Sequence, residues 1–66
     1  MQALASLLLQ YWSKIEPSLS KVLSPSEFKS IIIAHKGGLN TLIQWLVSHP
    51  DLVRVIKIIL GKYVSL

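Results

Sequence analysis

The residues able to carry acid, base or metal chemistry are few in this chain and lie far apart. Its two histidines are His35 and His49, and no cysteine accompanies them. A protein zinc site usually takes four His, Cys, Asp or Glu ligands, many of them at short spacings. We therefore expect no metal ion and no other cofactor. His35 lies near a predicted helix end and His49 precedes Pro50, so both are placed where a histidine commonly has a structural role.

The acidic residues are also explained by local structure. Glu27 fits a helix cap, Asp51 a helix start and Glu16 the position before a proline, which leaves no carboxylate pair for general acid–base catalysis. No serine lies in a Gly-x-Ser-x-Gly elbow, and Gly37-Gly38 alone cannot form a phosphate-binding loop. We predict that the chain is not an enzyme and has no small-molecule substrate.

Positive charge is the more informative feature. The basic residues are Lys14, Lys21, Lys29, Lys36, Arg54, Lys57 and Lys62, and the net charge is +4. Such residues often form only a solvated surface, but they also attract lipid headgroups or nucleic acid. Nucleic-acid readers concentrate basic residues on one recognition face. Here they are spread along the chain, so no nucleic acid is expected as a partner.

The large amphipathic aromatic residues allow two interpretations. Tyr11, Trp12, Trp45 and Tyr63 lie among apolar residues and near the ends of predicted helices. Packing in the core is the ordinary role of such side chains. Anchoring at a membrane interface, where tryptophan and tyrosine collect, is the functional alternative.

Length and composition predict one helical domain over residues 1–66. Apolar residues make up 52% of the chain and charged residues 15%, which argues against disorder. A chain this short buries only about 60% of its unfolded surface, so natural proteins of this size usually need additional support. Because there is no cysteine, that support must come from close helix packing, self-association or a membrane.

The apolar pattern and the proline and glycine positions predict a compact all-α bundle of four to five short helices. We expect helices over residues 1–15, 18–23, 25–36, 39–48 and 50–64. Glu16-Pro17 should end the first, because a residue before proline is pushed out of the α region. Ser24 with Pro25 and Glu27 forms a capping-box pattern for the third, and Gly37-Gly38 should end it.

No segment is predicted to span a membrane. The longest charge-free runs, residues 1–13 and 37–50, are shorter than the roughly 20 residues that a bilayer requires. Residues 3–9 are apolar, but no positive charge precedes them and no small-residue cleavage site follows directly. If the protein is secreted, we expect secretion without a cleavable signal peptide.

Three segments resemble the small leaderless bacteriocins of the aureocin and lacticin type. They are Tyr11-Trp12 with Lys14, the run from Leu42 to Leu46, and Pro50-Asp51-Leu52 followed by the run from Lys57 to Gly61. The resemblance covers mainly residues 38–62 and implies a saposin-like helical bundle that permeabilises bacterial membranes. Circular bacteriocins are a neighbouring family, in which the apolar Met1 and Leu66 would be joined.

The leading hypothesis is a cationic, secreted antimicrobial peptide that acts at the membrane of a target cell. The predicted membrane-binding residues are Lys14, Lys29, Lys36, Arg54, Lys57, Lys62, Trp12, Trp45 and Tyr63. The basic residues would attract an anionic lipid membrane, and the aromatic residues would insert into it. The alternative is a small helical interaction domain that binds a protein partner, or forms a homo-oligomer, through its excess apolar surface.

Overall fold

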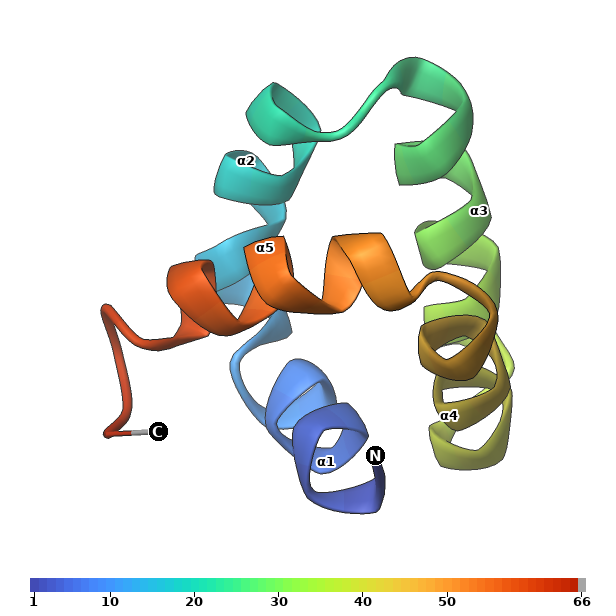
Figure 1. Ribbon diagram of the computed structural model, residues 1–66, viewed down its shortest axis with the longest axis horizontal. Helices are drawn as coiled ribbons and strands as arrows, with labels where there is room; N and C mark the ends of the chain where they lie inside the picture. The colour runs from blue at the N-terminus through green and yellow to red at the C-terminus, as the bar shows by residue number, and fades with distance from the viewer. Residues whose placement is uncertain (66) are drawn as a thin grey trace.

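A computed structural model describes residues 1–65, and within them every regular element is a helix. The helices are α1 (Gln2–Gln10), α2 (Trp12–Val22), α3 (Pro25–Lys36), α4 (Leu39–Ser48) and α5 (Pro50–Leu60). In Figure 1, α5 runs across the middle of the view in front of α2, while α3 and α4 lie on one side and α1 lies at the bottom. The prediction of a compact all-α bundle of four to five short helices is confirmed.

The first two helices meet at Tyr11 rather than at Pro17, so the predicted boundary there is wrong. Tyr11 has φ −106° and ψ 16°, and α2 continues through Pro17 to Val22. A straight helix over residues 2–22 would be about 32 Å long, whereas the longest dimension of the molecule is 25 Å. The break lets α1 pack on α4 and α5 while α2 packs on α5. Tertiary packing has outweighed the local effect of the proline.

The start of α3 agrees with the prediction to the residue. The Glu27 backbone N–H donates to Ser24 Oγ at 3.2 Å, and the Ser24 backbone N–H donates to Glu27 Oε1 at 2.9 Å. This reciprocal pair is a capping box, and it satisfies two donors that the end of a helix otherwise leaves free.

The two glycines between α3 and α4 have different roles. Gly38 has φ +96°, the one positive φ in residues 1–65, and only glycine adopts such a conformation readily. Gly37 has φ −77°, but a Cβ added to it would lie 2.6 Å from Thr41 Oγ1. Gly38 therefore provides the turn, and Gly37 allows the first turn of α4 to lie close to the end of α3.

The last helix is shorter than expected. Pro50 and Asp51 form its first turn as predicted, but α5 ends at Leu60 rather than near residue 64. The Gly61 N–H donates to the Lys57 carbonyl, and residues 61–63 form a turn. The possibility that Met1 and Leu66 are joined in a circular chain involves Leu66, which lies outside the described residues.

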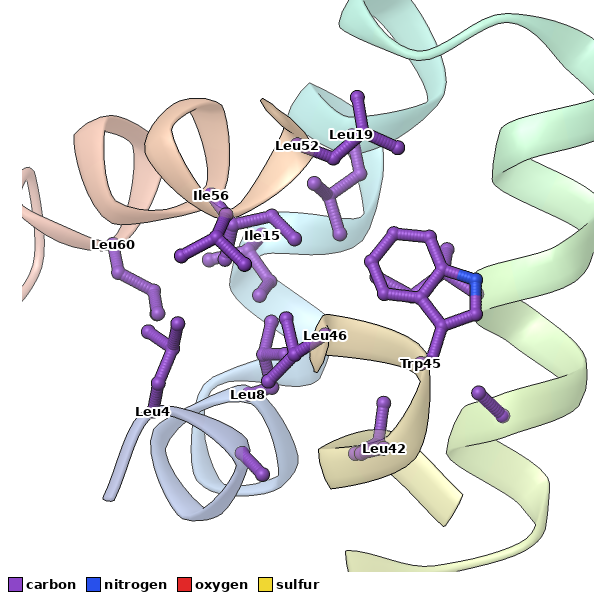
Figure 2. Packing of buried hydrophobic residues seen from close by; sticks show 14 of the residues in the cluster. Leu4, Leu8, Ile15, Leu19, Leu42, Trp45, Leu46, Leu52, Ile56 and Leu60 are labelled. Atoms are coloured by element: carbon purple, nitrogen blue, oxygen red, sulfur yellow. The ribbon is translucent and has the colours of Figure 1, made fainter. Parts of the chain in front are cut away.

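All five helices contribute to one core. Figure 2 shows Leu4 and Leu8 of α1 facing Leu46 of α4 and Leu60 of α5. The largest fully buried side chains are Leu8, Ile15, Leu19, Ile31, Leu42, Leu46, Ile56 and Leu60. Val22 is exposed although Leu23, which follows it, is buried, so Val22 lies on the side of α2 that faces away from the core.

Candidate functional site

The six basic residues predicted to bind a membrane are all exposed. Lys14 lies in the first turns of α2, Lys29 and Lys36 on α3, Arg54 and Lys57 on α5, and Lys62 in the turn that follows α5. The structure places them on three parts of the molecule and does not gather them into one cluster.

The outer side of α5 combines positive charge with an exposed aliphatic residue. Ile58 is 65% exposed, more than any other large hydrophobic side chain in residues 1–65. Arg54 lies four residues before it on α5, and residues four apart are neighbours on a helix surface. Lys57 directly precedes Ile58 in the last turn of the helix, and Lys62 lies in the turn that follows the helix. We call Arg54, Lys57, Ile58, Lys62 and Tyr63 the α5 basic face.

The same pattern occurs on α3. Ile33 is 60% exposed, with Lys29 four residues before it and Lys36 three residues after it. On α3 the exposed aliphatic residue therefore lies between two cations of the same helix, whereas on α5 it lies beside Arg54, with Lys62 in the turn beyond the helix. Sequence patterning did not predict that Ile33 and Ile58 would be exposed, since both lie within apolar runs.

Tyr63 connects the end of the α5 basic face to α2. Its side chain is exposed, and its hydroxyl donates to the Lys14 carbonyl at 3.4 Å. This contact joins residues 49 positions apart. It brings Lys14 to the same end of the molecule as Lys62, which no local sequence pattern indicates.

The two tryptophans are not free surface anchors in this conformation. Trp12 is half-buried and stacks on His35, with ring centroids 4.1 Å apart. Trp45 is only 7% exposed and stacks on His49 at 4.3 Å. The Trp45–His49 stack follows from their four-residue spacing. The contact between Trp12 and His35 joins distant parts of the chain and carries no sequence signal.

The Trp45 indole nitrogen and the His49 Nδ1 nitrogen each form a hydrogen bond. The Trp45 Nε1–H donates to Ser30 Oγ of α3, and Figure 2 shows the indole nitrogen on the side of the ring that faces α3. His49 Nδ1 lies 2.8 Å from the Trp45 carbonyl oxygen. A carbonyl only accepts, so Nδ1 carries the hydrogen, and the lone pair of the neutral ring lies on Nε2.

A pocket of about 330 Å³ lies beside these groups, between α3 and α4. Its apolar wall consists of Ile33, Ala34 and Trp45. Its polar residues are Ser30, Thr41, Gln44, Ser48 and His49. The pocket is a shallow depression that opens widely to solvent. It nevertheless combines an apolar wall with a few polar groups, as sites that bind small molecules do.

In residues 1–65, no group of three His, Cys, Asp or Glu side chains is arranged to hold a metal ion. No helix in the same range has both the length and the apolar character needed to cross a bilayer. Comparison with protein-family models, with curated proteins and with solved structures gives no match for this chain.

Proposed function

We propose that this protein is a cationic antimicrobial peptide of the bacteriocin type, which binds and permeabilises anionic bacterial membranes. It would act outside the cell that produces it. The observation that carries the proposal is the α5 basic face, where Ile58 is 65% exposed between Arg54 and Lys62.

Two physical contributions support this proposal. A basic side chain near an anionic leaflet contributes about 1 kcal/mol to binding. An exposed isoleucine gains free energy when its apolar surface leaves water, at roughly 25 cal/mol per Å². Lys57 lies in the last turn of α5, Lys62 follows that turn, and the Tyr63 contact brings the Lys14 backbone to the same end, so attraction would act near the exposed Ile58.

Insertion of the tryptophans requires a second step. Trp45 is buried, and Trp12 is held against His35. In the proposed mechanism the folded bundle first docks through α5, and the helices then separate and place the indoles at the acyl boundary. Helices are suited to this step, because each satisfies its own backbone hydrogen bonds after separation.

The test is dye leakage from vesicles, with tryptophan emission followed in parallel. We expect leakage and a blue shift with vesicles that contain an anionic lipid, and a weaker response with zwitterionic vesicles of the same size. Ile58→Ser should reduce leakage, whereas Val22→Ser, which changes an exposed aliphatic residue of α2, is the matched control. Absence of both leakage and spectral change on anionic vesicles would refute the proposal.

A second candidate function is a protein-interaction domain, including self-association. The observation in its favour is Val47, which is 62% exposed on α4, a helix with no charged residue. An uncharged surface with an exposed aliphatic residue suits contact with another protein. Sedimentation over a range of concentrations tests it. An association in plain buffer that Val47→Lys abolishes would support it, and a monomer at every concentration would argue against self-association.

A further inference from the structure

The pocket between α3 and α4 offers mainly hydrogen-bond acceptors to a ligand. The Thr41 hydroxyl donates to the Gly37 carbonyl at 3.2 Å, and the Ser48 hydroxyl donates to the Gln44 carbonyl at 3.0 Å. The hydrogens of both hydroxyls are therefore used, and only their lone pairs remain. When the His49 ring is neutral, it adds the lone pair of Nε2, since Nδ1–H is bonded to the Trp45 carbonyl.

Only two of the side chains that line the pocket have a hydrogen-bond donor that is still free for a ligand. Ser30 Oγ accepts from the Trp45 indole, so its own hydroxyl hydrogen remains, and the Gln44 amide both donates and accepts. A ligand that matches this set must donate two or three hydrogen bonds and accept one or two. Vicinal hydroxyl groups do this, because each hydroxyl has one donor and two acceptor positions.

Charge decides between a hydroxyl ligand and an ammonium ligand. An ammonium group also donates, but the protein carries a net charge of +4 and repels a cation. Ile33 lines the pocket, and Lys29 and Lys36 lie beside it on the same side of α3. An anionic group attached to the hydroxyl-bearing part would therefore meet positive charge at the edge of the pocket.

We propose that the pocket between α3 and α4 binds the glycerol headgroup of an anionic phospholipid. The two glycerol hydroxyls donate to two of the three acceptors on Thr41, Ser48 and His49. The carbon backbone lies against Ile33 and Ala34, and the phosphate lies near Lys29 and Lys36. The proposal rests on the membrane function above and adds a lipid preference to it, at the stage when the folded bundle binds the membrane and before its helices separate. The shared chemistry is a diol beside a phosphate, which a lipid or a free glycerophosphate ester could supply.

The experiment compares two vesicle preparations that have the same charge. One contains phosphatidylglycerol and the other an equal fraction of phosphatidylmethanol, which carries the same phosphate diester without a diol. We expect the full-length chain to bind the phosphatidylglycerol vesicles about tenfold more tightly, from two to three added hydrogen bonds. The double variant Thr41→Val/Ser48→Ala should lose this preference while binding phosphatidylmethanol vesicles as the parent does.

Ser20→Ala is the matched control, because Ser20 also donates its hydroxyl to a carbonyl, that of Pro17, but lies on α2 outside the pocket. It should keep the preference for phosphatidylglycerol. Free glycerophosphoglycerol, added without vesicles, distinguishes the two sources of the diol. Binding of that ester as tight as binding to the lipid would overturn the assignment to a lipid headgroup.

The remaining outcomes separate this inference from the proposed function. Equal binding to phosphatidylglycerol and phosphatidylmethanol vesicles would overturn the headgroup site and leave the membrane function intact. Binding to neither preparation would overturn both. Loss of the preference in Ser20→Ala would also count against the site, because that change leaves the pocket unaltered.

Discussion

Single residues show how this chain separates its buried and exposed apolar groups. Ile56 and Ile59 of α5 are buried, whereas Ile58 points to solvent between Arg54 and Lys62. The residues are of one type and lie within one short run, so their different roles come from their angular positions on the helix. Helix periodicity can predict that such a run has a buried side. It cannot predict how the other helices pack, and therefore it cannot show that none of them covers Ile58.

The charge of Lys57 provides a test of where the molecule docks. Lys57→Glu replaces +1 by −1 and lowers the net charge from +4 to +2. Lys21→Glu makes the same change, and both lysines lie in the last turn of a helix. We expect Lys57→Glu to weaken binding to anionic vesicles about tenfold and Lys21→Glu to have a smaller effect. Equal losses in a vesicle-sedimentation assay would mean that only total charge matters.

The hydrogen bond between Trp45 and Ser30 makes a prediction about stability. Ser30→Ala removes the acceptor of a buried indole N–H, which should lower the free energy of unfolding by about 1–2 kcal/mol. In the Trp45→Phe background there is no indole N–H, and the same serine substitution should have little effect. Urea unfolding of the four proteins measures the difference. Similar losses in both backgrounds would contradict the pairing.

At the level of helices, caps were predicted well and the α1–α2 junction was not. The Ser24–Glu27 box depends only on four consecutive residues, so its sequence pattern is enough to locate it. The break at Tyr11 depends on how α1 packs against α4 and α5, which no local pattern contains. The sequence did not predict the pocket for a similar reason, because its walls come from two helices. Its hydrogen-bond acceptors are hydroxyls that donate to a backbone carbonyl one turn earlier, as Thr41 does to Gly37.

The turn between α3 and α4 allows a test with two alanines of opposite handedness. Gly38→Ala places an L-residue at φ +96° and should destabilise the fold by about 1–3 kcal/mol. A D-alanine at residue 38, introduced by chemical synthesis, favours positive φ and should not be destabilising. Nothing lies within 4 Å of the Cβ that an L-residue would add. Thermal unfolding of the three proteins isolates backbone strain, and equal midpoints for both alanines would disprove it.

At the level of the whole molecule, the bundle is held together by apolar packing. The chain contains no cysteine, and the core draws on every helix within an extent of 25 × 24 × 21 Å. Small domains of this kind are marginally stable. A fold that depends on burying apolar surface can exchange its own core for the interior of a bilayer, and this exchange underlies the proposed opening.

That opening can be measured at the centre of the core. Leu8 and Leu46 have no exposed surface in the bundle, so a paramagnetic label on lipid acyl chains should not affect their methyl signals while the fold is closed. We expect these signals to broaden when the protein binds anionic bicelles, because helix separation would bring them to the acyl chains. Broadening confined to Ile58, with unchanged core methyls, would indicate docking without opening.

The two tryptophan–histidine stacks have a consequence for the light that the protein emits. Imidazole in contact with excited indole removes its energy without emission, and the protonated ring does so most strongly. Trp12 lies against His35 and Trp45 against His49, so both fluorophores are held beside such a group. We expect the folded protein to be dim. Emission wavelength then reports the surroundings of the indoles, while brightness reports whether each tryptophan remains beside its histidine.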